Sequence, residues 1–319
     1  MKFSIITPAL NQLAYLKRCI ASIADQVAGS GIVDGCALPV EQELPAAQQP
    51  DSLTPEHALR VHHHIQDGCS TDGTVEYLKE YIARQQSTDT YQLTFTSEAD
   101  GGMYDALNKG FSRATGEVFA WLNCDEQYLP GTLAKAAGFF LKYPEVDFIY
   151  GNALLLNENG SLLTYRKNPP LRRWYVQSDH LYTQSCAMFF RQHVFQETGC
   201  FDIQWKAVSD CDFITRLLKH GFKAGRMSEY LSVFFVTGQN LSNSRTGQDE
   251  LIRWRTTAPP PVRMLHYPLR VLRYLEKYFS GGYRERFPLE YAVYLSGDSE
   301  HRSTFKPATG SARFIAWSR

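Results

Sequence analysis

Acidic side chains follow candidate strands of this chain at several places. Asp67 comes after the stretch Arg60–Gln66, and Asp125 and Glu126 come after Val118–Leu122. If those stretches are buried strands, the carboxylates lie at the mouth of a sheet, where negative charge is costly unless a cation or a donor-rich ligand meets it. The pattern therefore points to a metal-bound ligand of the nucleotide type.

The run Asn123-Cys124-Asp125-Glu126 is the candidate metal site. Mg²⁺ and Mn²⁺ take oxygen ligands and usually keep waters and substrate phosphates, so one or two protein carboxylates suffice. We expect Asp125 and Glu126 to hold such a cation, which would neutralise a diphosphate leaving group. The alternative is a solvated acidic turn, and the presence of Asp67 in the same predicted sheet favours the metal.

Asp67 precedes a glycine, so we expect its carboxylate to face the crevice beyond the sheet and to accept a hydrogen bond from the imide or amino group of a base. Ser70 and Asp72, a few residues on, are equally typical of helix caps.

A second polar group surrounds a Gly-rich helix entry and consists of Asp100, Asp105, Asn108 and Lys109. Backbone amides at a helix start favour anions, and Lys109 is long enough to reach a phosphate. The alternative is an exposed amphipathic helix on which Lys109 is solvated.

Asp210 begins a predicted helix. An acid at that position can interact with the helix dipole alone, or it can act as a general base if a hydroxyl lies within hydrogen-bond reach. Spacing does not choose between these roles. The triplet His62-His63-His64 is a weaker metal candidate, because successive residues of a strand point to opposite faces and cannot converge on one ion. We expect a structural or surface role for it, and packing roles for Tyr104 and Trp121.

Composition narrows the class of protein. The chain has 319 residues, enough for one large α/β domain and an accessory segment, or for two modest domains. Its 33 basic and 33 acidic residues cancel, which argues against a nucleic-acid partner. Scattered cysteines and an N-terminus without a secretion signal predict reduced thiols in the cytoplasm. No window has the roughly 18 apolar residues of a membrane span, so we expect a soluble or peripheral protein.

Strands and helices alternate along the first half of the chain. We expect strands at 2–7, 60–66, 92–96, 118–122 and 148–150, helices beginning at 13, 75, 105 and 132, a hairpin at 153–165 that turns at Asn159-Gly160, a strand at 187–191 and a helix at 210–220. This alternation predicts an α/β fold with a mostly parallel central sheet flanked by helices. Ligands of such sheets bind at the carboxyl ends of the strands.

Two segments depart from this rhythm. Residues 27–56 have no clear period and are expected to form a surface insertion within a domain that covers 1–245. Residues 246–319 form a C-terminal extension that we expect to be helical. Its segment Leu265–Phe279 is basic, aromatic and amphipathic, which suits docking at a membrane surface. A helix packed on the rest of the chain or against a dimer partner is an equal alternative.

Taken in order, these motifs resemble the family 2 glycosyltransferases with a GT-A fold, particularly the branch that builds bacterial polysaccharides. The motifs that carry the resemblance lie at 6–11, 66–74, 97–116, 123–126, 184–191, 199–202 and 209–212. The resemblance implies an inverting, metal-dependent transfer of a sugar from a nucleoside-diphosphate sugar, with a UDP-sugar favoured. The acceptor would be a hydroxyl of a glycan or a lipid-linked molecule in cell-surface polysaccharide synthesis.

The resemblance also assigns roles to individual residues. The donor-binding positions are Pro8, Asn11, Asp67, Asp100, Asn108 and Lys109. Asp125 would hold Mn or Mg with help from Glu126, and Asp210 would be the catalytic base. The chain departs from the family pattern at Asn123, where an Asp is common, and at Thr183, where a His is frequent.

Two other functions fit parts of the pattern. A sugar-nucleotide nucleotidyltransferase would carry a Gly-rich, basic loop after the first strand, where this chain has Pro8-Ala9-Leu10-Asn11. A non-catalytic module that binds nucleotide-sugars would keep Asp67 but need no base at 210. For the transferase we expect a cytoplasmic location with peripheral contact at the inner face of the membrane, and a homo-oligomer as one assembly state.

Overall fold

A computed structural model describes residues 1–28, 58–85, 88–238 and 244–313. The predicted insertion at 27–56 lies outside the described residues, except that the first helix continues to Ala28. Within the described residues, one sheet contains nine strands in the order β3-β2-β1-β4-β8-β6-β9-β5, with β7 paired to β6. The strands are β1 Lys2–Ala9, β2 Arg60–Asp67, β3 Tyr91–Ser97, β4 Val118–Trp121, β5 Glu126–Tyr128, β6 Phe148–Leu156, β7 Leu162–Arg166, β8 Met188–Arg191 and β9 Ala224–Phe235.

The sheet is mostly parallel, as predicted. Strands β3, β2, β1 and β4 pair in parallel, and so do β6 and β9, whereas β8, β5 and β7 pair antiparallel with their neighbours. The register sets Ala9 beside Asp67 and Asp67 beside Ser97. Because parallel strands end at the same edge, the segments that follow β1, β2, β3 and β4 all emerge along one side of the molecule.

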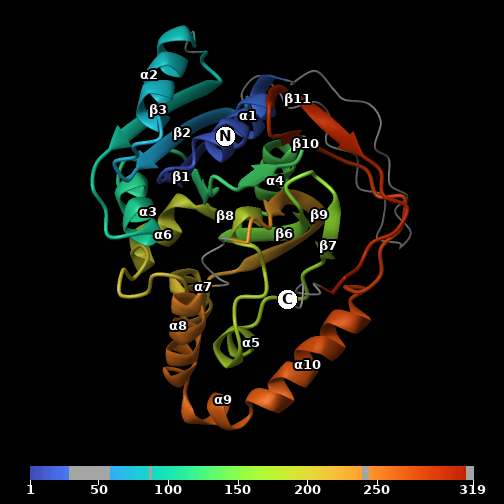
Figure 1. The fold of residues 1–319 in the computed structure, drawn as a ribbon. Coiled ribbons are helices and arrows are strands. Elements are labelled where there is room, and N and C mark those ends of the chain that lie inside the picture. The colour runs from blue at the N-terminus through green and yellow to red at the C-terminus, as the bar shows by residue number, and fades with distance from the viewer. Residues whose placement is uncertain (29–57, 86–87, 239–243, 314–319) are drawn as a thin grey trace.

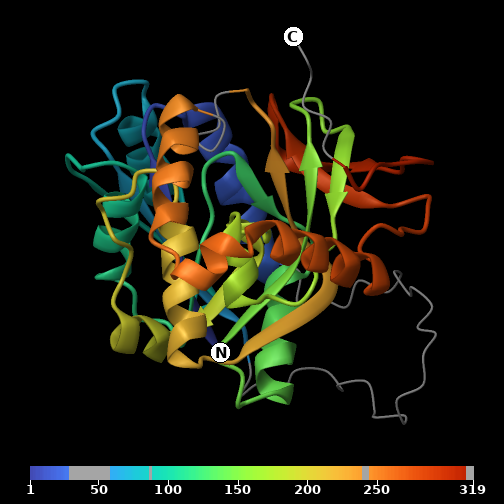
Figure 2. The same ribbon diagram turned by 90° about the horizontal axis from the view of Figure 1, so that it is seen from below.

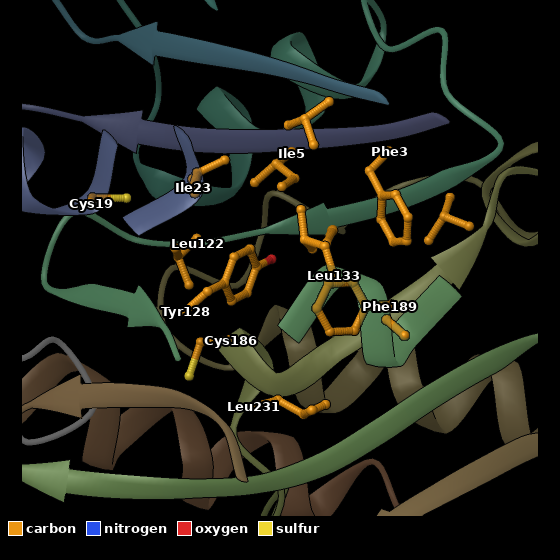
Figure 3. Close-up of a cluster of buried hydrophobic side chains, with 14 of the residues drawn as sticks. Phe3, Ile5, Cys19, Ile23, Leu122, Tyr128, Leu133, Cys186, Phe189 and Leu231 are labelled. Atoms are coloured by element: carbon orange, nitrogen blue, oxygen red, sulfur yellow. The ribbon is translucent and has the colours of Figure 1, made fainter. Parts of the chain in front are cut away.

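Helices cover both faces of the sheet (Figure 1). They are α1 Leu13–Ala28, α2 Thr74–Arg84, α3 Met103–Phe111, α4 Thr132–Lys142, α5 Arg173–Ser178, α6 Gln192–Thr198 and α7 Ser209–His220, with a short 3₁₀ turn η2 at Ser185–Ala187. Successive residues of β1 point to opposite faces, so Ile5 packs in one core and Ile6 in the other. Leu133 of α4 and Phe189 of β8 share the core of Ile5 (Figure 3). Packing on both faces of the sheet thereby fixes the position of β1.

The C-terminal extension contains the predicted helices and an unpredicted hairpin. The helices are α8 Arg245–Thr256, α9 Pro260–Met264 and α10 His266–Phe279, and the hairpin strands are β10 Tyr291–Leu295 and β11 Asp298–Phe305. The hairpin returns to α1, where the guanidinium of Arg302 and the hydroxyl of Tyr294 both donate to Asp25. Helix α10 crosses the face of the molecule seen in Figure 2. Among the described residues, no helix has the length and apolar character needed to cross a bilayer.

The predicted hairpin at 153–165 is present, since β6 and β7 pair antiparallel and Gly160 lies between them with φ of 81°. Positive φ at this turn suits glycine, which has no Cβ to clash.

The histidine triplet of β2 is buried, which confirms a structural role. The ring of His63 lies between Thr7 Oγ1 at 2.9 Å and Tyr91 Oη at 3.1 Å, on the face opposite to its two neighbours. His62 and His64 both contact Thr94 Oγ1 at 2.9 Å. Burial lowers the pKa of His63 to about 3, and the neighbouring His64 adds to this effect. The triplet thus packs as neutral rings.

This burial predicts an acid-sensitive fold. The folded-state pKa of His63 lies below the ordinary value of 6.5, so protons bind the unfolded chain first and stability falls as the pH drops below 6.5. Between about pH 7.5 and about pH 5, His63 should lower the free energy of unfolding by about 2 kcal/mol. Urea unfolding of the parent protein and of His63→Gln at both pH values isolates this contribution, which the variant should lack.

The matched control is His220→Gln, at the exposed end of α7. The prediction is wrong if His63→Gln keeps the full pH dependence of the parent, or if the control loses as much of it.

Candidate active site

The carboxylate of Asp67 is fixed at the carboxyl end of β2. The side chain is fully buried, and its Oδ2 accepts hydrogen bonds from Ser97 Oγ at 2.6 Å and from the backbone N–H of Ser70 at 3.1 Å. Its other oxygen, Oδ1, is buried and has no hydrogen-bond partner among the described residues. An acceptor held in this way is costly to leave unpaired, so it suits a ligand that brings an N–H donor.

Hydrogen bonds join the segments that follow β1 and β2. The Asn11 N–H donates to Ser70 Oγ at 2.8 Å, and Asn11 Oδ1 accepts from the Thr71 N–H at 2.8 Å. The carbonyl of Pro8 accepts from Cys124 Sγ at 3.3 Å, which ties β1 to the segment after β4. Pro8 and Asn11 therefore lie at the same edge as Asp67, with the Asn11 side-chain oxygen used inside the protein.

Asp72 caps two helices, which supports the capping alternative for this residue. Its Oδ2 accepts from the N–H of Leu13, the first residue of α1, at 2.9 Å. Its Oδ1 accepts from the N–H and hydroxyl of Thr74, the first residue of α2, at 3.2 and 2.6 Å. One side chain thus satisfies backbone donors of both helix starts.

The Gly-rich entry to α3 brings Asp100 to the loop after β2. Asp100 Oδ1 accepts from the Gly102 N–H at 2.8 Å. Its Oδ2 lies 2.6 Å from the point that a Cβ on Gly68 would occupy, so any larger residue at 68 would collide with it. Glycine at 68 therefore permits the carboxylate of Asp100 to approach the chain directly after Asp67.

The other polar residues of α3 are engaged within the protein. Lys109 Nζ donates to the Ala99 carbonyl at 2.7 Å and forms an ion pair with Asp105 at 3.1 Å. The side-chain amide of Asn108 both donates to and accepts from the backbone of Phe201, at 2.8 and 2.9 Å. These contacts attach α3 to neighbouring loops, and donor binding by Asn108 and Lys109 stays a prediction.

The acidic run after β4 divides between a loop and a strand. Glu126 begins β5 and is buried, and its Oε2 accepts from the Asn123 N–H at 2.7 Å. Burial, followed by the negative charge of Asp125, raises the pKa of Glu126 to about 8. Asp125 is half-buried, and its carbonyl accepts from the N–H of Phe235 at the end of β9.

These oxygen atoms suit a divalent cation whose coordination shell would be completed by oxygens of the substrate. Asn123 Oδ1 is buried without a hydrogen-bond partner among the described residues, close in sequence to Asp125 and Glu126. Oxygen acceptors are therefore in excess at this edge, which suits a hard cation. The described residues contain no group of three or more His, Cys, Asp or Glu placed to hold a metal by themselves. A bound diphosphate would have to supply the remaining ligands.

A buried arginine lies within electrostatic reach of these acids, and no motif in the sequence indicated it. Arg18 is 5% exposed, and its Nε and Nη1 have no hydrogen-bond partner among the described residues. Its guanidinium lies 4.6 Å from the ring centre of Tyr15 and 5.1 Å from that of Phe235. Burial lowers the pKa of Arg18, while Tyr15, Glu158 and, to a smaller extent, Asp125 act in the opposite direction. Two unpaired cationic donors beside an acidic edge suit an oxyanion.

Asp210 lies at the start of α7 and contacts the start of α3. It is half-buried, its Oδ1 accepts from the Cys211 N–H at 2.8 Å, and the Tyr104 hydroxyl donates to its carboxylate. Burial raises the pKa of Asp210. Tyr104 is 3% exposed and packs on Phe201, so the packing role predicted for it is confirmed, although its hydroxyl contact was not predicted. A carboxylate with a raised pKa near a helix start has the properties of a general base.

Side-chain contacts connect these groups along one edge of the sheet. Ser97 links Asp67 to the end of β3, and the next few residues lead through Asp100 to α3, whose Tyr104 reaches Asp210. On the other side, Cys124 links β1 to the acidic run. Donors and acceptors from separate parts of the chain thus share one region.

Comparison with known proteins gives consistent results. Residues 46–197 match the family model "Glycosyl transferase family 2". A PGL/p-HBAD biosynthesis glycosyltransferase of Mycobacterium bovis is 25% identical over 264 residues, which cover 82% of this chain and 88% of that protein.

Solved structures share the fold. A structure of S. aureus TarS 1-349 in complex with UDP-GlcNAc has a TM-score of 0.54 at 14% identity and covers 97% of this chain and 100% of that one. A second, longer structure of S. aureus TarS matches 95% of this chain, and the matched part is 60% of that longer chain. The mannosyltransferase PcManGT from Pyrobaculum calidifontis, in complex with GDP-Man and Mn2+, has a TM-score of 0.53 at 16% identity, covering 88% of this chain and 75% of that chain.

The unpaired donors of Arg18 predict that this residue does not stabilise the fold. Replacing it by methionine should raise the free energy of unfolding by about 1 kcal/mol, since a buried cation with unmade hydrogen bonds is removed. Urea unfolding measures the change. Arg302→Met is the matched control, because Arg302 also packs against α1 but bonds Asp25, and it should lose about 1–3 kcal/mol. A clear loss of stability in Arg18→Met would contradict the prediction.

Proposed function

The chain is a family 2 glycosyltransferase with a GT-A fold, and we propose that it transfers a sugar from a nucleoside-diphosphate sugar to a hydroxyl of a glycan or lipid-linked acceptor. The proposed setting is cell-surface polysaccharide synthesis, with inversion at the anomeric carbon and a requirement for Mn or Mg. The observation that carries the proposal is the buried Oδ1 of Asp67, which has no hydrogen-bond partner in the described part of the chain and lies at the same strand edge as the acidic run after β4.

The nucleoside end of the donor would bind at the loops after β1 and β2. Asp67 Oδ1 would accept a hydrogen bond from the N–H of the base, which suits the imide of uracil and favours a UDP-sugar. Pro8 and Asn11 lie in the same loops and would form the walls of the pocket. Asp100 is held against Gly68 and would contact the sugar-nucleotide beyond the base.

The diphosphate would lie near Asp125 and Arg18. Arg18 would donate to phosphate oxygens through Nε and Nη1, which would satisfy both unpaired groups. Asp125, with Glu126 behind it, would hold the divalent cation. When bound there, such a cation would neutralise the charge that develops on the diphosphate.

Asp210 would act as the base on the acceptor side. The acceptor hydroxyl would give its proton to the Asp210 carboxylate as its oxygen attacks the anomeric carbon, and the bond from that carbon to the diphosphate would break on the opposite side. The configuration at the carbon inverts, and the nucleoside diphosphate leaves. The Tyr104 hydroxyl would keep the carboxylate oriented, and burial brings its pKa closer to neutral.

The first prediction separates the metal from the diphosphate. We expect UDP to bind the parent protein more tightly than GDP does, and more tightly with Mn than without it. Asp125→Asn should lose the gain in affinity that Mn gives, while it still binds UDP weakly without metal. Arg18→Met should weaken binding about tenfold with or without Mn, because it removes donors and not a metal ligand. Isothermal titration of each protein, with and without Mn, measures these affinities. Asp249→Asn, exposed on α8, is the control. Equal Mn dependence in Asp125→Asn would exclude its role as a metal ligand.

The second prediction tests the base. Asp210→Asn should lower the release of nucleoside diphosphate from the best donor in a UDP- and GDP-sugar panel by about 10²–10⁴-fold, with donor affinity unchanged. Tyr104→Phe should move the acidic limb of the pH–rate profile to higher pH, since the carboxylate loses a hydrogen bond. Asp212→Asn, two residues further along α7, is the matched control. Full activity in Asp210→Asn would rule out the proposed base.

A further inference from the structure

Helix α10 is attached to the molecule by its polar side. Arg273 is 4% exposed, and its guanidinium pairs with Asp179 at 2.6 Å. The carboxylate of Glu276 accepts hydrogen bonds from Nε and Nη2 of Arg172, at 2.9 and 2.6 Å. A surface helix of a globular protein normally turns its apolar stripe to the core. In α10 the polar stripe faces the body of the protein instead.

The opposite side of the helix is apolar and exposed. Of the fifteen exposed large hydrophobic residues in the described part of the chain, nine lie between 264 and 279. We call them the apolar face of α10, in which we include the last residue of α9 and the residue that joins the two helices: Met264, Leu265, Tyr267, Val271, Leu272, Tyr274, Leu275, Tyr278 and Phe279. Their exposed fractions run from 43% at Tyr274 to 81% at Phe279. Such a contiguous apolar surface indicates an interaction site, and single exposed apolar residues elsewhere do not.

Cations flank the apolar face. Arg263 and Arg270 are exposed, and between residues 260 and 279 the only acid is Glu276, which is turned toward Arg172. Beneath the helix, Arg166 Nε and Arg273 Nη1 are buried without hydrogen-bond partners among the described residues. Burial, together with the charges of these two arginines, lowers the pKa of Lys277 to about 8. The helix therefore carries an excess of positive charge next to its apolar face.

We propose that α10 docks on the surface of an anionic phospholipid bilayer, with its axis in the plane of the membrane and the apolar face of α10 inserted among the acyl chains. Exposed tyrosines suit the interface between headgroups and acyl chains, and the flanking arginines suit lipid phosphates. A second copy of the chain fits this surface less well, because a two-fold dimer would bring the same basic flanks against each other. Charge complementarity thus favours the anionic membrane.

Docking through α10 would hold the candidate active site near the bilayer. Three contacts lead from the helix to Asp210: Arg273 pairs with Asp179, the nearby Leu181 N–H donates to Cys211 Sγ at 3.3 Å, and the Cys211 N–H donates to Asp210. The acceptor side of the site therefore lies on the side of the molecule that α10 occupies. This inference goes beyond the proposed function and does not depend on it, because vesicle binding needs neither donor nor acceptor.

Vesicle sedimentation of the full chain tests the proposal. The parent protein should sediment with vesicles of roughly three parts phosphatidylcholine to one part phosphatidylglycerol, sediment less in high salt, and remain in solution with phosphatidylcholine alone. The triple variant Val271→Ser, Leu275→Ser and Phe279→Ser should bind at least about tenfold more weakly, since it removes the centre of the apolar face. Its melting temperature should match that of the parent, because the three side chains are exposed.

The matched control replaces three exposed apolar residues elsewhere in the chain, Leu141→Ser, Ile203→Ser and Ile252→Ser, and should keep vesicle binding. Arg263→Gln with Arg270→Gln should weaken binding to anionic vesicles and flatten its salt dependence. Analytical ultracentrifugation gives the oligomeric state of each variant.

Absent or salt-independent binding of the parent protein would overturn the proposal. So would a parent dimer that the triple variant converts to a monomer without any change in vesicle binding. Asp125→Asn should bind vesicles normally, which separates this test from the catalytic one.

Discussion

Backbone N–H groups hold the carboxylates of this protein where strands end and helices begin. Five acids each accept such a bond within a few residues of their own position: Asp67 from Ser70, Asp100 from Gly102, Asp105 from Gly101, Glu126 from Asn123 and Asp210 from Cys211. Bonds from backbone N–H groups to carboxylates are stronger than neutral ones and do not neutralise the acid. These bonds fix the geometry of the edge and oppose the effect of burial, which raises the pKa of Glu126 to about 8 and also raises that of Asp210. The edge therefore holds its oxygen acceptors in place, which suits a cation and a diphosphate.

The two-sided core makes these positions precise. Neighbouring residues of β1 belong to different cores, so the strand cannot slip by one residue without exposing both sets of apolar side chains. The registers of β1 with β2 and of β2 with β3 fix Asp67 beside Ser97. Asp72, by capping α1 and α2 together, aligns the helices that follow β1 and β2. Rigid strands and shared caps thus position a site that is built from loops.

The C-terminal extension follows a different rule. Its hairpin returns to α1 through ion pairs and hydrogen bonds, and α8 buries Trp254 against Val176 and Trp205. Helix α10 is held to the body by Asp179 and Arg172, which pair with its Arg273 and Glu276, instead of by an apolar stripe. The ion pairs to the body fix the orientation of the helix and leave its apolar side available to another surface.

The amino-acid sequence determined the alternation of strands and helices, the end of β2 at Asp67 and the acidic run after β4. These follow from local periodicity, and parallel strands necessarily bring such ends to one edge. It also predicted the turn at Gly160, since that turn depends on a single residue type. The fold class and the core of the predicted site are thus contained in short stretches of sequence.

Tertiary structure decided the rest, because it depends on partners far away in the chain. Strand β9 mixes exposed Arg226 and Glu229 with buried residues and is formed by pairing with β6 and β5. Arg18 is buried, and one of the two rings against it belongs to Phe235, which is more than 200 residues away in the chain. The amphipathic character of α10 is evident from the sequence, but the contacts with Asp179 and Arg172 determine which side of the helix faces outward. Local patterns define elements, whereas long-range ion pairs and packing define their orientation.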